Sequence, residues 1–315
     1  MAPSDPAGPR VGVDLGGTKI LAVRVEDGAV VAEEKRSTPR DGPAAVLEAV
    51  AAMVRRLGTD VVAVGLGGPG RVDHRRGILG PAPNIPGWDV AVPVADHLTA
   101  DLGLPVRVDN DVNAAALAEH RWGAGAGHAD LLVVFVGTGV GGALVLGDHL
   151  VRGRHGLAGE IGHMMVVPDG RRCGCGRAGH VEAYAGRRGV ERAARERHAA
   201  GEPTLLVERQ REGRITSTVV VEALAAGDRV ARELVDAAAL ALGRGIAAAV
   251  ALVDVSQVVL GGGFAERLGP GFAAAVADQA RTLGFPGTEL TVVRAALGDR
   301  AGARGAALLG VTPPR

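Results

Sequence analysis

The sequence predicts an α/β protein with two lobes, each of which opens with a β-hairpin. The first observation is a repeated layout, because an apolar run, a Gly/Thr turn and a second apolar run occur over 11–30 and again over 131–151. The second is the alternation of Val-rich runs with segments in which Ala, Leu and Val recur at helical spacing. The third is length, since 315 residues without a long linker allow one large domain or two of ordinary size.

The composition indicates a core of small side chains and excludes several classes of protein. Hydrophobic residues make up 47% of the chain but aromatic residues only 2%, so Ala, Val and Leu must fill the core. Lys plus Arg and Asp plus Glu are both 35, which predicts no broad basic field for nucleic acid. Two cysteines cannot form a disulfide framework. The Ala-rich stretch 237–253 is interrupted by Arg244 before it reaches membrane-spanning length. Because the N-terminus lacks the apolar core of a signal peptide, we expect a cytoplasmic protein with no nucleic-acid or membrane partner.

Residue type and spacing predict the elements of the first half. Val-rich apolar runs predict strands, the pair Asp27-Gly28 predicts a hairpin turn, and Gly123 ends a run of strong helix formers. The expected strands are 11–15, 20–25, 29–32, 61–70 and 105–111, and the expected helices are 43–57, 89–102 and 112–123.

The second half repeats this pattern and then becomes more helical. The run 131–151 predicts a second hairpin around a glycine turn, and 255–264 predicts a buried strand that ends in glycines. The remaining expected elements are a strand at 290–295 and helices near 182–196, 219–252, 270–283 and 299–309.

Glycine turns at 14–19, 65–70, 137–142 and 261–263 could contact phosphate through their backbone N–H groups. Two of them fit G-x-G-x-x-G, but a dinucleotide fingerprint must open a helix, whereas a polar loop and a strand-like run follow these two. An ordinary hairpin turn explains any one of the loops taken alone. The first turn is more specific, since Asp14, Thr18 and Lys19 add a carboxylate, a hydroxyl and an ammonium group suited to phosphate and magnesium.

Segments spread over nearly the whole chain resemble the ROK family of sugar kinases and repressors, and most closely its bacterial glucokinases. The resemblance implies a two-lobed actin/hexokinase-like fold with a ribonuclease H-like sheet in each lobe and ATP and sugar in the cleft between them. The small lobe is expected at 1–115 plus about 296–315, and the large lobe at 116–295. The segments are VGVDLGGTK (11–19), GLGGPGRVD (65–73), PNIPGW (83–88), VDNDVNAAALAE (108–119), GTGVGGALV (137–145), GLAGEIGHM (156–164), CGCGRAGHVEAYA (173–185) and LGGGF (260–264).

The resemblance implies ATP-dependent phosphorylation of a hexose, with glucose first among the candidates. Asp111 matches the catalytic base, although an Asp between a strand and a helix is equally suited to cap the helix. The residues implied to bind sugar are Asn84, Asn110, Asp111, Glu160, His163 and Glu182. Those implied to bind ATP with Mg²⁺ are Asp14, Gly16, Gly17, Thr18, Thr138, Gly139, Gly261 and Gly262, with Lys19 as either a phosphate ligand or a solvated residue.

The resemblance also implies a structural zinc site. His163, Cys173 and Cys175 stand where zinc-bearing members of the family have one His and the first two of three Cys, and His180 replaces the third. Two Cys and two His can close a tetrahedral Zn²⁺ site, which would orient His163 and the loop that carries Glu182. In the alternative, the metal was lost with the third cysteine, and two thiols and a surface histidine remain.

Other functions stay open at this stage. The sugar can instead be N-acetylmannosamine, N-acetylglucosamine or fructose, and the phosphate donor can be polyphosphate. A sugar-responsive regulator of the same family is disfavoured, because only thirteen residues precede Asp14 and a helix-turn-helix domain needs more. The resemblance further implies a homodimer or homotetramer.

Overall fold

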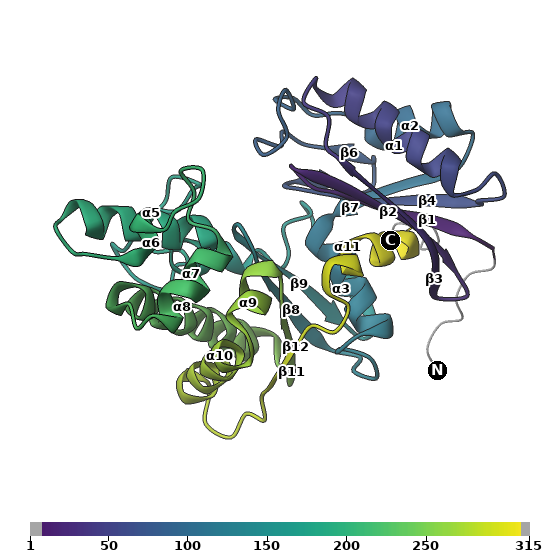
Figure 1. Cartoon of the computed structure of the whole chain (residues 1–315). Helices are drawn as coiled ribbons and strands as arrows, with labels where there is room; N and C mark the ends of the chain where they lie inside the picture. The colour runs from purple at the N-terminus through teal and green to yellow at the C-terminus, as the bar shows by residue number, and fades with distance from the viewer. Residues whose placement is uncertain (1–7, 310–315) are drawn as a thin grey trace. The chain divides into compact units, whose positions relative to one another are not determined.

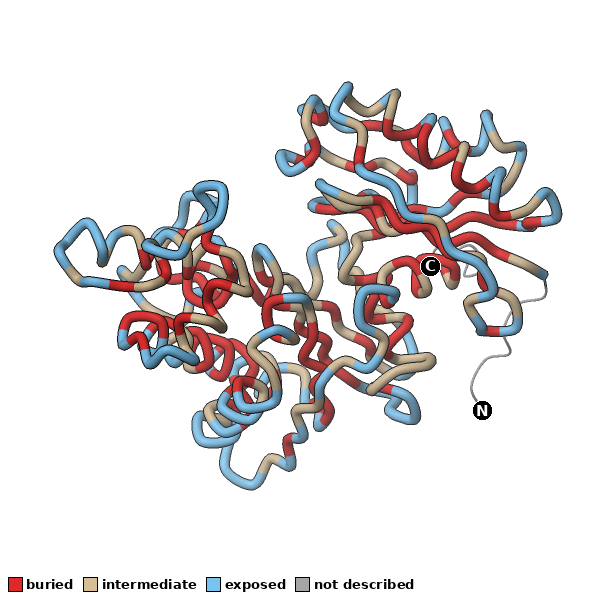
Figure 2. The backbone as a smooth tube through the Cα atoms, in the orientation of Figure 1, coloured by how far each residue is buried: buried red, intermediate tan, exposed pale blue. Residues whose placement is uncertain are grey.

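The computed structural model describes residues 8–309 and divides into two compact units, each built on one five-stranded sheet (Figure 1). The strand orders are β3-β2-β1-β4-β7 and β10-β9-β8-β11-β12, which follow the same path in chain order and confirm the repeat seen in the sequence. Figure 2 shows buried residues along the central strands of each sheet. Of the described residues, unit 1 comprises 8–127, 150–158 and 299–309, and unit 2 comprises 128–149 and 159–298.

The sheet of unit 1 combines an antiparallel meander with parallel strands. β1 pairs antiparallel with β2, and β2 with β3, whereas β4 lies parallel to both β1 and β7. The carboxyl ends of β1, β4 and β7 therefore share one edge of the sheet. The strands are β1 (Arg10–Leu15), β2 (Lys19–Glu26), β3 (Ala29–Ser37), β4 (Ala63–Gly68) and β7 (Val106–Asn110), with a separate two-stranded hairpin of β5 (Val72–Asp73) and β6 (Ile78–Leu79).

Four helices cover the two faces of this sheet (Figure 1). On one face lie α1 (Pro43–Leu57) and α2 (Val94–Leu102), and on the other lie α3 (Asp111–Trp122) and α11 (Ala301–Leu309), which follows the short turn η2 (Gly298–Arg300). α1 occupies the range that the sequence predicts. α2 starts later than expected, because Pro93 precedes it and Val92 instead forms a bridge with Leu79.

Glycines allow α11 to lie directly on the sheet. A Cβ atom on Gly12 of β1 would lie 1.9 Å from the carbonyl oxygen of Ala303, and one on Gly65 of β4 would lie 1.7 Å from that of Ala306. A third such contact joins the two helices, since a Cβ on Gly305 would lie 1.7 Å from the carbonyl oxygen of Ala114 in α3. Any larger residue at these positions would separate the backbones.

The sheet of unit 2 repeats the arrangement and carries more helices. β11 lies parallel to β8 and β12, and β9 pairs antiparallel with β8. The strands are β8 (Leu131–Val136), β9 (Val140–Leu146), β10 (His149–Val151), β11 (Gln257–Gly261) and β12 (Thr291–Arg294). The helices are η1 (Ile161–His163), α4 (Val181–Ala185), α5 (Arg187–Ala199), α6 (Leu205–Glu208), α7 (Ser217–Ala225), α8 (Arg229–Val253), α9 (Gly263–Leu268) and α10 (Pro270–Leu283).

Two helices expected as continuous are interrupted. The range 182–196 breaks at Gly186, where the backbone is extended and α5 begins. The range 219–252 breaks after α7, because Gly227 has a φ of 79° and Asp228 starts a new helix by accepting a hydrogen bond from the N–H of Ala231. Local helical spacing is continuous across both breaks, so the sequence alone predicted longer helices.

The central helix of unit 2, α8, is long and apolar enough to cross a membrane by length and composition. This is weak support for a span, because 61% of the apolar window is buried within the protein. α8 packs against α10, α4 and α5, and its side chains Leu234, Leu242 and Ile246 belong to the main core of unit 2. The burial is typical of a core helix.

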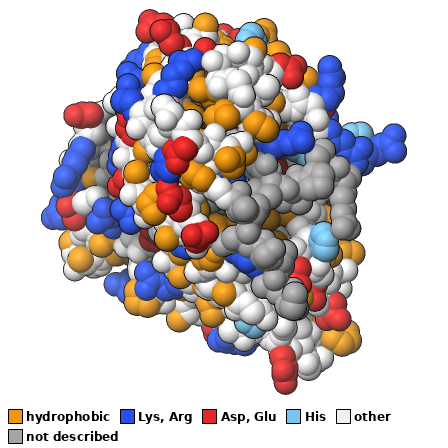
Figure 3. All heavy atoms as spheres, turned by 90° about the vertical axis from the view of Figure 1, so that its right-hand side faces the viewer, with side chains coloured by type: hydrophobic (Ala, Val, Ile, Leu, Met, Phe, Trp, Pro, Cys, Tyr) orange, Lys and Arg blue, Asp and Glu red, His pale blue; other side chains and the backbone are white. Residues whose placement is uncertain are grey.

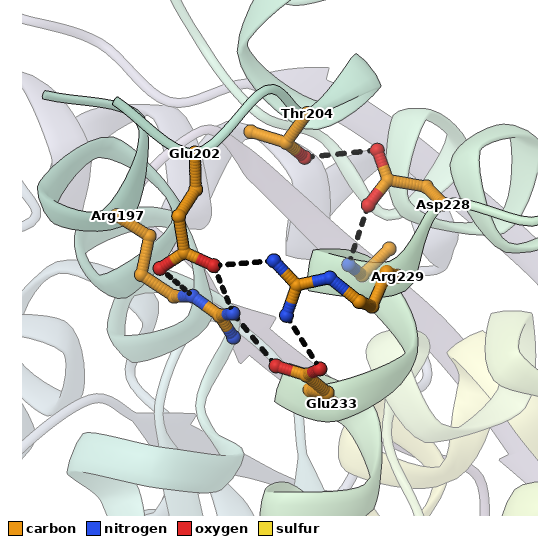
Figure 4. A network of polar contacts seen from close by, with 7 residues as sticks. Arg197, Glu202, Thr204, Asp228, Arg229 and Glu233 are labelled. Carbon is orange, nitrogen blue, oxygen red and sulfur yellow. Dashed lines mark hydrogen bonds and ion pairs between the residues drawn. The ribbon is translucent and has the colours of Figure 1, made fainter. Parts of the chain in front are cut away.

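Charged side chains of both signs are interspersed on the face drawn in Figure 3. Acidic and basic groups do not gather on this face into a field of one sign. This agrees with the sequence, in which 35 Lys and Arg residues balance 35 Asp and Glu residues. The surface also carries organised ion pairs, and one network ties α5 to the start of α8 (Figure 4).

In this network the Glu202 carboxylate accepts hydrogen bonds from Arg197 and from Arg229, whose Nη2 lies 2.7 Å away. Both arginines also pair with Glu233, at 2.6 and 2.7 Å. The hydrogen bonds from Arg197, and then those from Arg229, lower the pKa of Glu202 to about 2. A carboxylate with a lowered folded-state pKa stabilises the fold above its unfolded pKa, and the contribution is lost as pH falls toward 2.

Glu202→Gln is therefore expected to lower the Tm at pH 7 by roughly 1–3 °C, and the difference from the wild type should shrink as pH falls below about 4.5. Thermal unfolding at pH 7 and pH 3 measures both effects. The matched control is Glu208→Gln, since Glu208 is exposed and makes no ion pair among the described residues. A Tm difference that does not depend on pH would contradict the assignment.

Candidate active site and metal site

The parallel strands of unit 1 bring two acidic positions to one edge of the sheet. The register pairs Asp14 of β1 with Gly67 of β4, and Gly67 with Asp109 of β7. The chain continues from Asn110 at the end of β7 directly into α3 at Asp111. In open α/β sheets, ligands bind at the carboxyl ends of parallel strands, so this edge is the candidate site of unit 1.

The first glycine turn joins β1 to β2 and is held from two sides. The N–H of Gly16 donates to the carbonyl of Lys19 at 3.0 Å, and the hydroxyl of Thr38 donates to the carbonyl of Gly16 at 2.6 Å. A Cβ on Gly17 would lie 2.3 Å from the carbonyl oxygen of Asn84, so the turn packs on the loop that carries Asn84. Thr38 is a buried residue at the end of a hairpin, and no sequence motif around it predicts its contact with the turn.

Asp14 and Lys19 have different electrostatic surroundings. Burial raises the pKa of Asp14 to about 6, although the nearby Lys19 ammonium lowers it. Lys19 Nζ lies 2.7 Å from Asp299 Oδ2 in a largely exposed ion pair. Exposed pairs of this kind are worth about 0–1 kcal/mol, so exchange of Asp299 for another anion would cost little. Thr18 is exposed, and its carbonyl accepts the N–H of Thr38.

The cap of α3 is Asn110, not Asp111. The side-chain oxygen of Asn110 accepts the N–H groups of Val112 at 2.9 Å and Asn113 at 3.2 Å, and its Nδ2 donates to the carbonyl of Gly70. Asp111 is the first helical residue, and its Oδ1 lies 2.9 Å from the N–H of Val112. The partly exposed Asp111 carboxylate thus lies in the first turn of α3.

Asp109 precedes this pair and is buried. Its carboxylate accepts the N–H of Asn110 at 2.8 Å, Nδ2 of Asn113 at 2.9 Å and Nε of Arg152 at 2.6 Å. Neither Asp109 nor Arg152 was among the residues that the sequence analysis singled out. They are 43 positions apart, and no motif spacing connects them.

The second glycine turn lies in unit 2 between β8 and β9 and packs against the break between α4 and α5. The N–H groups of Arg187 and Arg188 donate to the carbonyls of Gly137 and Thr138 at 3.0 and 3.1 Å. A Cβ on Gly139 would lie 2.2 Å from Oε2 of Glu182, so Gly139 allows the Glu182 carboxylate to approach the turn.

Glu182 joins this turn to the cysteine loop. Its Oε2 accepts the N–H of Val140 at 3.1 Å, and its Oε1 lies 3.4 Å from the sulfur of Cys173. The glycines after β11 approach the end of β8 next to the same turn, since a Cβ on Gly262 would lie 2.6 Å from the backbone nitrogen of Val136. Gly261 is also constrained, because its Cβ would lie 2.3 Å from the ring of Phe135.

His163, Cys173, Cys175 and His180 form a group that can hold a metal ion, with one ligand atom from each within 4.8 Å of the others. The sulfur of Cys173 lies 3.8 Å from Nδ1 of His163, and that of Cys175 lies 3.3 Å from Nδ1 of His180. Tetrahedral bonds of 2.0–2.3 Å place ligand atoms about 3.3–3.8 Å apart, so the donor set fits Zn²⁺. Burial raises the pKa of the Cys173 thiol to about 12, so a metal must displace its proton on binding.

His163 presents its two nitrogens to different partners. Nδ1 faces the sulfur of Cys173, while Nε2 lies 3.8 Å from Oε2 of Glu160. A metal on Nδ1 would leave Nε2 free to donate a hydrogen bond on the Glu160 side. The residues predicted from the sequence therefore form two sets: Asp14, Gly16, Gly17, Thr18, Lys19, Asn84, Asn110 and Asp111 in unit 1, and Thr138, Gly139, Glu160, His163, Glu182, Gly261, Gly262 and the metal group in unit 2.

The sequence pattern of the ROK family matches residues 10–312. The chain belongs to the ROK family. The glucokinase of Streptomyces coelicolor is 44% identical to the chain over 190 residues, which are 59% of this chain and 59% of that protein. The aligned part therefore spans less than two thirds of the length of this curated relative.

Solved ROK structures share the fold over nearly the whole chain. The ROK hexokinase of Thermus thermophilus has a TM-score of 0.84 at 37% identity, covering 96% of this chain and 97% of that one. A ROK glucokinase of Streptomyces griseus, in complex with glucose and AMPPNP, has a TM-score of 0.78 at 38% identity, covering 96% and 99%. The two units are thus those of the actin/hexokinase-like fold predicted from the sequence.

Gly17→Ala is expected to destabilise unit 1, because the added methyl group meets the backbone of Asn84 rather than a movable side chain. Overpacking of this kind costs about 1–3 kcal/mol, measured as the free energy of unfolding in urea. The control is Gly137→Ala in the equivalent turn of unit 2, where an added Cβ has nothing within 4 Å. Equal effects of the two substitutions would show that the close approach of Asn84 does not constrain the turn.

Proposed function

We propose that this ROK chain is an ATP-dependent hexose kinase that phosphorylates the 6-hydroxyl of glucose, with Asp111 as the general base. The observation that carries the proposal is the edge of the unit 1 sheet. There Asn110 caps α3, and the Asp111 carboxylate follows it at the carboxyl ends of the parallel strands, which also carry Asp14 and its glycine turn. The likeness to ROK glucokinases supports glucose as the hexose.

The proposed reaction needs positioning and charge neutralisation more than covalent help from the protein. Asp111 accepts the proton of the 6-hydroxyl while the oxygen of that hydroxyl attacks the γ-phosphorus. The bond between the γ-phosphorus and the bridging oxygen then breaks and releases ADP. Asp14 is the acid that would hold Mg²⁺ or its waters, and the bound ion would supply positive charge to the phosphates. Backbone N–H groups of Gly16, Gly17 and Thr18 would bind phosphate oxygens.

Residues of unit 2 complete the proposed substrate contacts. Thr138 and Gly139 would bind phosphate, and Gly261 and Gly262 would approach the nucleoside. Sugar hydroxyls would pair with Glu160, Nε2 of His163 and Glu182, together with Asn84 and Asn110 of unit 1. A site built from such polar groups rejects sugars that leave one of them unpaired.

We further propose that His163, Cys173, Cys175 and His180 hold a structural Zn²⁺. With all four positions filled by protein, the ion would activate no water. It would instead fix the tautomer of His163 and, through the contact of Cys173 with Glu182, the loop that carries this proposed sugar ligand. The cytoplasmic location expected from the sequence and the homodimer or homotetramer implied by the family resemblance remain part of the proposal.

Asp111→Ala is expected to fold and to lose about 10²–10⁴ in kcat, because the 6-hydroxyl loses its proton acceptor. Its Tm should change little, since an acid at the first turn of a helix is worth about 0.3–1 kcal/mol. A coupled assay of ADP release measures turnover, with Asp89→Ala as the exposed control in the same unit.

The same assay tests the substrate. The wild type should have its highest kcat/KM with glucose when compared with fructose, N-acetylmannosamine and N-acetylglucosamine, using ATP and polyphosphate in parallel. Near-normal turnover by Asp111→Ala would refute the role of the base. Higher kcat/KM for another sugar would transfer the proposal to that kinase activity, and no turnover with any of these sugars would refute it.

Protein purified without a His-tag is expected to contain one zinc ion per chain by elemental analysis. Cys173→Ser should lose the metal, lower the Tm and raise the KM for glucose roughly 10-fold while leaving that for ATP unchanged, because the metal orients only sugar-side groups. His155→Gln, at an exposed histidine outside the metal group, is the control. Substoichiometric zinc in the wild type, or an unchanged glucose KM in Cys173→Ser, would overturn the assignment.

A further inference from the structure

Residues 150–158 group with unit 1 and form a short excursion of the chain between two segments of unit 2; the first two of them also end strand β10. The excursion closes on itself, since the N–H of Ala158 donates to the carbonyl of Arg152 at 3.1 Å. It also lies against β5, because a Cβ on Gly156 would be 2.7 Å from the carbonyl oxygen of Val72. The next residues of the chain lead to Glu160 and His163, two of the proposed sugar ligands.

One buried ion pair fastens this excursion to the strand that precedes the proposed base. Nε of Arg152 lies 2.6 Å from Oδ2 of Asp109, and the exposed fractions of the two side chains are 21% and 3%. A buried carboxylate is retained only when it is paired and hydrogen-bonded, because the low-dielectric surroundings strengthen its attraction to a cation and penalise its loss.

The other oxygen of Asp109 holds the beginning of α3. Oδ1 accepts the N–H of Asn110 at 2.8 Å and Nδ2 of Asn113 at 2.9 Å. Asn110 in turn caps the helix whose first residue is Asp111. The single carboxylate of Asp109 therefore connects Arg152, on the segment that leads to Glu160, with the backbone that carries Asp111.

We propose that Arg152 and Asp109 are positioning residues. Their ion pair holds the segment 150–158, which leads to the proposed sugar ligands, against the end of β7 that leads into the proposed base Asp111. The inference rests on the proposed kinase function for its catalytic meaning, and neither side chain is assigned a contact with substrate. Small misplacement of a reacting group costs rate steeply, so release of this pair should affect turnover beyond its effect on stability.

The test compares Arg152→Gln with Arg154→Gln. Arg154 lies two positions further along the same excursion, is exposed and forms no ion pair among residues 8–309, so the control removes the same charge without touching Asp109. Arg152→Gln should lower kcat/KM for glucose about 10- to 100-fold and leave the KM for ATP within about two-fold. Arg152→Lys should recover part of the loss, because it restores a cation without the guanidinium geometry.

A second readout does not depend on activity. Amide hydrogen exchange over 106–113 in the ligand-free protein should be at least about 10-fold faster in Arg152→Gln than in Arg154→Gln. The reason is that the junction between β7 and α3 loses the ion pair that stabilises it. If the wild type proves not to be a kinase, the proposed function fails, while this measurement still decides whether the pair orders the junction. Wild-type exchange in a folded Arg152→Gln would overturn the inference.

A merely structural pair would lower the Tm and leave the kinetic constants unchanged, and that result would also overturn the inference. If Arg152→Gln does not fold, the double substitution Asp109→Asn and Arg152→Gln takes its place, since it removes both charges and leaves no buried carboxylate unpaired. The double variant should show the same loss in kcat/KM for glucose and the same faster exchange. Wild-type values for both in the double variant would refute the proposal.

Discussion

The architecture of unit 1 depends on backbone contact between α11 and the sheet. Gly12, Gly65 and Gly305 leave no side chain between the helix and its neighbours, and a Cβ at any of them would lie within 2 Å of a carbonyl oxygen. This contact fixes β1 and β4 against a rigid helix. The edge where these strands and β7 end then carries the glycine turn, Asn110 and Asp111. Small residues in the core are thus a requirement of the site and not only a feature of composition.

The two units share one sheet topology and carry different side chains at the corresponding edges. In each sheet the first hairpin supplies a glycine turn, and parallel strands added beside it supply further groups at the same edge. At this edge unit 1 carries the carboxylates of Asp14 and Asp111, whereas unit 2 carries Thr138, Gly139 and the glycines after β11. The cysteine loop is an addition to this plan, and Glu182 connects it to the turn through opposite oxygens of one carboxylate.

Local pattern predicted much of the fold, and tertiary contacts decided the rest. Helix 43–57 was predicted to the residue, because Pro43 and Gly58 mark its ends. The breaks at Gly186 and Gly227 were missed. After Gly186 the carbonyls of the second glycine turn accept the N–H groups of Arg187 and Arg188, whereas at Gly227 a positive φ turns the chain and the N–H bonds back to the carbonyl of Leu224 in α7. Adjacent Asn110 and Asp111 suit a cap equally, and only the structure assigns it to Asn110. Arg152 gave no signal, because its partner lies on a distant strand.

The position of α11 in the chain has a consequence for biosynthesis. Unit 1 begins the described sequence, yet its sheet is covered by a helix near the other end, at Ala301–Leu309. The ribosome therefore releases the strands of unit 1 long before the helix that completes their packing. Unit 2, which comprises 128–149 and 159–298 and has its own core, emerges in between and can fold before the strands of unit 1 meet α11.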